Sequence, residues 1–298
     1  MNRKIIPCIL IAFFIVGASL AALPHDKLKR EQRKLERKAR DKYLGLGMGG
    51  SYIKVIDNAT SPLLYRGLTI PFVSLGYLTH SEKIIKTFEA DFSFGELKSR
   101  TETPWYDQRN TSFWLAFRYN HLFRVRHFAK PSINWYLGPE INTNAHLRVN
   151  YKYENSAFTF DNYNGIGFSS RIELPFGYKA AAFKFLFMNL KRRDRNLWLS
   201  WQLSVPVVSW MLRPTYVTIT NFVDPELQSA VTTDHTDGGL FVPMNIRSQT
   251  ELFYELHNGN LFKLAYIWNF YHHDPGYNKV QSAFHAVCFS FVFKFNQN

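Results

Sequence analysis

The stretch F-S-F-V-F-K-F-N-Q-N, residues 289–298, decides the fold of this 298-residue chain. Phenylalanine occupies every second position from Phe289 to Phe295, and smaller or polar residues stand between. Successive side chains of a β-strand point to opposite faces, so one face of this segment carries an aromatic stripe. A soluble sandwich buries such a stripe under a second sheet, whereas a membrane barrel turns it towards lipid.

The same two-residue period recurs through most of the chain. Apolar and polar residues alternate in the segments 84–94, 111–125, 165–178 and 197–207. These predicted strands exceed the five or six residues usual in soluble sheets and suit a tilted membrane strand of about 9–11 residues. We therefore predict an all-β fold, an antiparallel transmembrane β-barrel formed by residues 44–298.

The alternation and the turn signals together predict about twelve strands. Their expected ranges are 44–56, 65–79, 83–97, 111–126, 131–142, 165–178, 181–190, 196–211, 214–222, 245–257, 260–271 and 280–295. This assignment places the long connections on one side and the tight turns on the other, with H-N-G-N at 257–260 the clearest turn. The stretch 147–153 also alternates, and we assign it to a hairpin within the long connection 143–164. Barrels of ten or fourteen strands are the alternatives.

The N-terminus has the pattern of a secretory signal peptide. The basic start M-N-R-K precedes an apolar region and the small residues A-S-L-A-A, which predicts a signal at residues 1–21 with cleavage after Ala21. The alternative is an uncleaved anchor, because residues 5–23 are just long enough to span a bilayer. After cleavage Cys288 is the one remaining cysteine, so the mature chain can form no internal disulfide.

Residues 22–43 form a basic segment that differs from the rest of the chain. Residues 24–43 hold nine Lys or Arg and four Asp or Glu, with opposite charges three and four positions apart. This spacing predicts a short helix. We interpret it as a solvated periplasmic helix or loose tail, and the alternative is a helix that plugs the barrel lumen.

The charge and composition indicate which partners to expect. The net charge is +13, but no basic, glycine-aromatic motif of the RNA-binding kind is present, so we expect no nucleic acid partner. The basic excess and the export signal favour outer-membrane lipid and lipopolysaccharide. We also expect the barrel-assembly machinery during biogenesis and other envelope proteins as partners.

Charged residues of both signs fall on the predicted inner face of the strands. The candidates for lining the lumen are Glu89, Asp91, Arg118, Arg124, Glu140, Arg171, Glu173, Glu251, Glu255 and Lys263. They could form a salt-bridge network that closes the barrel, or they could line a narrow, charge-selective pore.

Two predicted outer loops carry residues of the types that bind metal ions. The weak candidates for a metal site are Asp234, His235, Asp237, His272, His273 and Asp274. Imidazole and carboxylate groups suit zinc and similar ions, although most such loop residues are simply solvated. We expect no cofactor.

Catalysis is the less favoured interpretation. The alternation places His121 and His285 on the face predicted to contact lipid. We expect them at opposite rims of the barrel, and we find no serine partner for either. The sequence also lacks a phosphate-binding loop, a dinucleotide fingerprint and a nucleophile elbow. We predict a non-catalytic outer-membrane barrel, either a narrow channel or an accessory or structural subunit. The alternative is a barrel enzyme of the phospholipase or lipid A deacylase type.

Two segments also resemble known outer-membrane proteins. The final strand is similar to the C-terminal recognition signal of bacterial outer-membrane barrels, which the assembly machinery reads, although three residues follow Phe295 here. The stretch N-A-T-S-P-L-L-Y-R-G at 58–67 resembles segments of uncharacterised small barrels from Bacteroidota-type bacteria. The resemblance implies a Gram-negative outer membrane and a porin-like barrel, and it implies no activity.

Overall fold

The fold was analysed in a computed structural model of the chain. The structure describes residues 40–99, 108–125, 133–150, 152, 158–178, 181–185, 188–192, 195–213, 236–276 and 278–295. Almost all of these residues lie in β-strands or in the turns that join them. The described part of the chain has no helix with the length and hydrophobicity needed to cross a bilayer.

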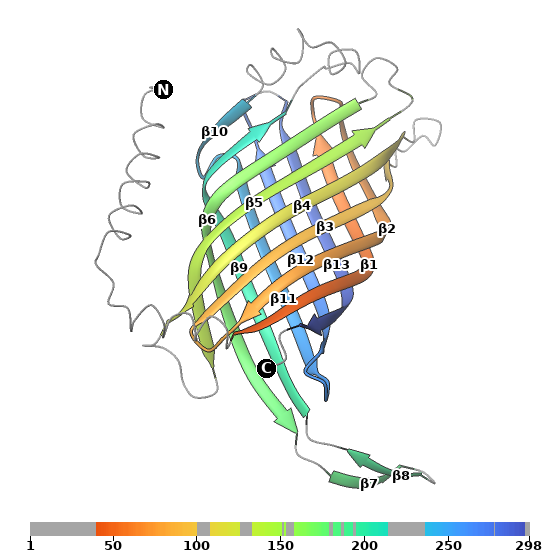
Figure 1. The fold of residues 1–298 in the computed structure, drawn as a ribbon. Coiled ribbons are helices and arrows are strands. Elements are labelled where there is room, and N and C mark those ends of the chain that lie inside the picture. The colour runs from red at the N-terminus through yellow and green to blue at the C-terminus, as the bar shows by residue number, and fades with distance from the viewer. Residues whose placement is uncertain are drawn as a thin grey trace, which may run out of the picture. The chain divides into compact units, whose positions relative to one another are not determined.

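Ten strands of the described chain form one closed antiparallel barrel (Figure 1). In ring order they are β1 (Asp41–Asp57), β2 (Ser61–His80), β3 (Ile84–Ser99), β4 (Gln108–Arg124), β5 (Asn134–Val149), β6 (Phe158–Tyr178), β9 (Arg195–Leu212), β11 (Met244–Glu255), β12 (Leu261–His273) and β13 (Val280–Lys294). The last strand pairs with the first from Tyr43 opposite Lys294 to Asp57 opposite Val280. This pairing closes the ring and leaves neither strand with an open edge.

The prediction of about twelve strands is wrong, and the alternative of ten strands in the barrel is confirmed. Strand β6 pairs directly with β9, and β9 pairs directly with β11, so the ring has no place for strands at 181–190 or 214–222. The first range instead forms a separate hairpin of β7 (Ala181–Phe185) and β8 (Met188–Arg192). The second lies outside the described residues. A further strand, β10 (Thr236–Leu240), pairs with β9 outside the ring.

Several predicted boundaries also change. Strand β1 begins at Asp41, so the last residues assigned to the basic tail belong to the barrel. Strand β5 continues to Val149 and β6 begins at Phe158, because the alternating stretch after 143 extends these two strands instead of forming a separate hairpin. The turn at 257–260 is confirmed, and Gly259 takes a positive φ of 76° there. The signal peptide and the basic helix lie outside the described residues and stay predictions.

The two ends of the barrel are named here by their connections. The distal end carries the connections 58–60, 100–107, 150–157, 213–243 and 274–279. The proximal end carries the start of β1, the end of β13 and the connections 81–83, 125–133, 179–194 and 256–260. The predicted asymmetry of long and short connections is therefore only partial, since 179–194 lies on the side expected to hold tight turns.

The predicted alternation of faces is confirmed in the described strands. On β13, Phe289 and Phe293 point outward and are about half exposed, while Ser290 and Val292 between them are buried inside the barrel. A register shift opposite Gly167 reverses the alternation within β9, so Val208 and Trp210 face outward beyond it. Such a bulge shifts every later side chain to the other face.

Side chains of the inner face form successive layers along the barrel. On β12 the inward order from the proximal end is Leu261, Lys263, Ile267 and Tyr271. An apolar layer, an ionic layer, a second apolar layer and a second ionic layer therefore follow one another. The two ionic layers are the most distinctive chemistry of the molecule.

Candidate functional site: the closed lumen

Four charged side chains form a ring of ion pairs near the distal end, here named the distal ring. It consists of Asp57, Arg148, Asp161 and Arg213. Arg148 donates from Nη2 to Asp57 Oδ2 and from Nη1 to Asp161 Oδ2, both at 2.6 Å. Arg213 donates to the remaining oxygen of each carboxylate, at 3.1 Å for Asp161 Oδ1. Each arginine thus bridges both carboxylates with separate donors of its planar guanidinium.

The distal ring crosses the lumen. Asp57 ends β1, Arg148 lies on β5, Asp161 lies on β6 and Arg213 follows β9. In the ring of ten strands β5 and β9 are each four strands from β1, so the ion pairs of Asp57 with Arg148 and Arg213 cross the lumen. Tyr271 on β12 adds a hydrogen bond from its hydroxyl to Asp161 Oδ2 at 3.1 Å.

An apolar layer follows on the proximal side of the distal ring. Its centre is Trp114, whose ring stacks on Phe284 with centroids 4.0 Å apart, and Phe72 packs against the same phenylalanine. These side chains belong to one buried cluster that includes residues of β1, β2, β3, β4, β6, β9, β12 and β13. Aromatic side chains of this size fill a barrel interior that would otherwise hold water.

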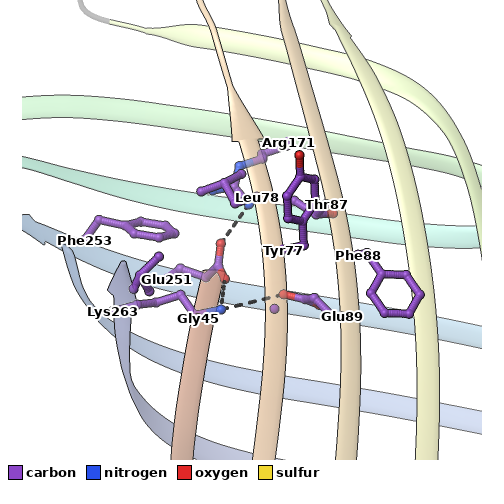
Figure 2. A pocket seen from close by; sticks show the side chains of 12 residues that line it. Gly45, Tyr77, Leu78, Thr87, Phe88, Glu89, Arg171, Glu251, Phe253 and Lys263 are labelled. Atoms are coloured by element: carbon purple, nitrogen blue, oxygen red, sulfur yellow. Dashed lines mark hydrogen bonds and ion pairs between the residues drawn. The ribbon is translucent and has the colours of Figure 1, made fainter. Parts of the chain in front are cut away.

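A larger ionic cluster, here named the proximal network, follows that layer. Arg118 donates to Asp91 at 2.5 Å, and Arg171 donates to Glu251 at 2.7 Å. Lys263 lies between the carboxylates of Glu251, at 3.1 Å, and Glu89, at 3.7 Å. Figure 2 shows Lys263 joining these two carboxylates, with Arg171 on the other side of Glu251.

The proximal network also joins opposite walls. Arg247 on β11 lies 3.4 Å from Glu89 and 3.5 Å from Asp91, both on β3, and these two strands are five apart in the ring. Gln249 donates to both Glu89 and Glu251, which links the halves of the network. A cavity of about 30 Å³ beside Lys263 has room for a water molecule or two.

Small residues on β1 and β2 make room for these long side chains. Gly45 faces Gly76 across the two strands, and both line the cavity of the proximal network. A Cβ added at Gly76 would meet nothing within 4 Å. The wall therefore leaves space on this side for Lys263 and its carboxylate partners.

The inward charges are shielded from water at every layer that the structure describes. Arg148 and Asp161 are each 2% exposed, and Glu89, the most exposed carboxylate of the proximal network, is 8% exposed. A water-filled pore would leave such side chains accessible along its wall. The arrangement is therefore a packed interior stabilised by ion pairs.

The ten residues predicted to line the lumen fall into three groups. Seven belong to the proximal network or border it: Glu89, Asp91, Arg118, Arg171, Glu173, Glu251 and Lys263. Glu140 is buried beside the network and accepts a hydrogen bond from Asn142 at 2.9 Å. Arg124 and Glu255 lie at the proximal rim instead, where Arg124 pairs with the exposed Glu82 and Glu255 accepts from Asn196.

The sequence analysis missed the whole distal ring and Arg247. Arg148 and Asp161 lay in a stretch assigned to a long connection, and Asp57 and Arg213 lay at predicted strand ends. The signal that could have found one of them is the alternation of 147–153, which continues β5 and gives Arg148 inward parity.

The predicted metal ligands do not gather in the described chain. Neighbouring residues His272 and His273 point to opposite faces of β12, and only His273 approaches Asp237, at 3.7 Å. Asp274 accepts a hydrogen bond from the backbone of Gly276. Asp234 and His235 lie outside the described residues, and within the described ones no group of three potential ligands is found.

One serine–histidine pair lies inside the barrel. Ser112 Oγ is 2.8 Å from His146 Nε2, and Arg148 Nη1 is 3.0 Å from His146 Nδ1. A guanidinium can only donate, so Nδ1 must accept and the ring proton sits on Nε2. His146 therefore donates to Ser112, whereas a general base would have to accept the serine proton. Both residues are also buried, so this pair is structural.

The two histidines predicted to face lipid are not brought together. His285 lies on β13, where its Nδ1 is 2.8 Å from the hydroxyl of Tyr266. His121 lies on β4, stacked on Phe123 with centroids 4.6 Å apart. Three strands separate β4 from β13 in the ring, so the two histidines share no site.

Comparisons with known proteins find likeness in fold alone. No family model and no curated protein sequence matches the chain. The solved outer membrane protease OmpT from Escherichia coli is 9% identical, with 86% of this chain and 96% of that chain covered and a TM-score of 0.45. The transport unit of the autotransporter AIDA-I from Escherichia coli is 8% identical, with 86% and 90% covered and a TM-score of 0.39. Neisserial surface protein A is 8% identical, with 85% and 97% covered and a TM-score of 0.33. At these values the likeness is to the β-barrel fold of outer-membrane proteins and extends to no activity.

Proposed function

We propose that this protein is an integral outer-membrane barrel with a closed lumen, acting as an accessory or structural subunit of the cell envelope. In this role the barrel anchors the chain in the bilayer, and the distal connections present the surface that partners contact. Of the two non-catalytic roles expected from the sequence, we retain the accessory or structural subunit and reject the open channel.

The observation that carries the proposal is the pair of ionic layers that cross the lumen. The distal ring joins β1 to β5 and β9, and the proximal network joins β3 to β11. Large barrels of 16 or more strands leave an aqueous channel, whereas a barrel of about eight strands is just wide enough for side chains to fill. A ten-stranded barrel filled with Arg, Lys and Trp side chains belongs with the filled class.

The outer face supports a position in a bilayer. Outward residues on β1, β4 and β13 such as Leu46, Leu115 and Phe289 are apolar and exposed, which would be unfavourable in water over so large an area. A lipid-facing band of this kind is typical of transmembrane barrels. The closed antiparallel ring also satisfies every strand edge, as the hydrocarbon core requires.

The chemistry of the lumen does not favour the barrel enzyme. Among the described residues, the serine–histidine pair Ser112–His146 holds the proton on the wrong nitrogen for nucleophilic catalysis, and both side chains are inaccessible. We therefore favour the accessory or structural role over the lipid-modifying enzyme.

Reconstitution tests both parts of the proposal. The mature protein, refolded into phosphatidylcholine vesicles loaded with an ion-sensitive dye, should resist extraction by alkaline carbonate and should not discharge an imposed ion gradient. A general porin in the same vesicles serves as the positive control. Extraction by carbonate would contradict the membrane assignment, and dye response at the rate seen with the porin would contradict the closed lumen.

A further inference from the structure

Four basic residues form a line on the outside of the barrel, here named the cation row. It consists of Lys54, Arg66, Lys98 and Arg109, one on each of the neighbouring strands β1, β2, β3 and β4 (Figure 1). Lys54 is paired in register with Arg66, Arg66 with Lys98, and Lys98 with Arg109. All four side chains are exposed on the outward face. With strands about 4.8 Å apart, the row is about 14 Å long.

The row is confined to one side of the barrel. No outward position of β5, β6, β11, β12 or β13 in the described chain holds Lys or Arg. General attraction of a basic protein to an anionic surface would distribute outward cations around the barrel. The concentration on four adjacent strands therefore indicates a localised site.

Within the part of the chain that the structure describes, the cations of the row have little negative charge nearby. Among the described residues the ion pairs of the row reach only Glu96, which lies 3.7 Å from Lys98 and 3.4 Å from Arg109. Like charges directly opposite one another on a sheet are destabilising. One carboxylate for four cations leaves a net positive strip that an external anion would neutralise.

The height of the row matches the headgroup region of a bilayer. On β1 the outward face is apolar from Leu44, and Lys54 follows ten residues later. Ten residues extend about 33 Å along a strand, or about 23–27 Å along the axis of a barrel tilted by about 35–45°. This equals the height of the apolar band of an outer-membrane barrel, about 25 Å, so Lys54 at the β1 end of the row lies at its distal border.

Exposed apolar side chains lie directly below the row on the same strands. Leu68 and Ile70 on β2 are 63% and 62% exposed, and Phe94 on β3 packs against Phe113 on β4 with ring centroids 4.8 Å apart. A strip of positive charge above an apolar patch fits an amphiphile with phosphate groups at the headgroup level and acyl chains alongside the barrel.

We propose that the cation row and the apolar patch below it bind one phosphorylated glycolipid of the outer leaflet, of the lipid A class. The phosphates lie against Lys54, Arg66, Lys98 and Arg109, and the acyl chains lie along Leu68, Ile70, Phe94 and Phe113. The inference rests on the proposed membrane position of the barrel and adds a defined lipid site to it.

Native mass spectrometry tests the proposal. It measures the binding of lipid A by the refolded mature protein in detergent micelles. The row variant carries K54Q, R66Q, K98Q and R109Q. Its matched control carries K42Q, K83Q, K86Q and K294Q. These changes remove the same number of positive charges at the proximal end of the barrel, from β1, from β3 and the turn before it, and from β13. We expect the control to bind lipid A like the wild type and the row variant to bind it at least tenfold more weakly. Lipid A stripped of its phosphates should bind the wild type as weakly as intact lipid A binds the row variant.

Two results would overturn the lipid site. One is equal binding by the row variant and the wild type, and the other is equal binding of intact and dephosphorylated lipid A. Heat-dependent migration on gels shows whether each variant is folded, and single substitutions such as R66Q replace the fourfold variant if it is not. Insertion of the wild type into phosphatidylcholine vesicles is measured in parallel. Insertion without phosphate-dependent binding rejects the lipid site and keeps the proposed function, whereas failure to insert rejects both.

Discussion

The inside and the outside of the same four strands use charge in opposite ways. On β3, Asp91 points inward and lies 2.5 Å from Arg118, whereas Lys98 points outward and is paired in register with two other cations. Inside, charged groups of both signs neutralise one another across the lumen. Outside, one sign dominates, and in the described chain a single carboxylate, Glu96, opposes four cations. The inner charges therefore serve the fold, and the outer charges are the ones that we propose to bind a lipid partner.

The energetic difference between these two regions follows from burial. Removing one member of a buried ion pair leaves its partner charged, desolvated and unpaired, which costs about 3–5 kcal/mol. Exposed ion pairs contribute about 0–1 kcal/mol because water already solvates both groups. Matched substitutions on the two faces should therefore separate stability from lipid binding.

The largest effect is expected for Arg148→Met in the distal ring. This change leaves Asp57 and Asp161 with one guanidinium for two buried carboxylates, and we expect a loss of about 3–5 kcal/mol in the free energy of unfolding. Urea titration in phosphatidylcholine vesicles, followed by tryptophan fluorescence, measures it. The control Arg109→Met changes an exposed arginine and should leave the urea midpoint unchanged. Equal midpoints for the two variants would remove the distinction between the faces.

A smaller loss is expected for Lys263→Met in the proximal network. Glu89 and Glu251 would lose the cation between them, but Arg171 still pairs with Glu251 and Arg247 with Glu89. We therefore expect a loss of about 2–3 kcal/mol. The same urea titration measures it, with Lys86→Met on the outward face of β3 as the control. A loss as large as that of Arg148→Met would show that the remaining arginines do not compensate.

Two glycines on the inner face should respond in opposite ways to an added methyl group. A Cβ at Gly47 would collide with the side chains of Ser290 and Cys288, whereas a Cβ at Gly76 meets nothing within 4 Å. We expect Gly47→Ala to destabilise the barrel by about 1–3 kcal/mol, as overpacking does. Gly76→Ala should be neutral or slightly stabilising in the same titration. The reverse order would contradict the described packing beside the proximal network.

The smallest effect is expected for Glu96→Gln on the outer face. Loss of this carboxylate frees Lys98 and Arg109 from their ion pairs and should raise lipid A affinity by a few-fold, with no change in the urea midpoint. Native mass spectrometry with intact lipid A measures the change. A weaker binding of lipid A would mean that Glu96 orients the cations and does not compete with the phosphates.

The alternation of residues predicted the barrel and the face of most charged side chains. Phe289 to Phe295 predicted the closing strand, and the parity of Glu89, Asp91 and Arg118 placed them inside. The strand number could not be predicted, because the range 181–190 alternates like a barrel strand and only its pairing shows that it forms a separate hairpin.

To predict the candidate sites, one would need the pairing register of the strands, which the sequence does not reveal. Arg66 and Lys98 are 32 positions apart in the chain, and nothing local indicates that they are paired. Likewise Asp57 and Arg213 come together only because β1 and β9 lie across the lumen from each other. The sequence predicts the sign of each charge and the strand face on which it lies. It does not predict which charged residues are in contact across the barrel.

The single measurement that tests the closed lumen most directly is conductance in a planar bilayer. Refolded protein, shown to be folded by its heat-dependent gel migration, is compared as the mature chain and as a form that also lacks residues 22–39. Because the ionic layers are built from the barrel strands and Arg213, we expect both forms to insert without conducting steps. Steady ion-selective steps from the mature chain, or steps that appear when residues 22–39 are removed, would contradict the account and identify an open channel or a plugged one.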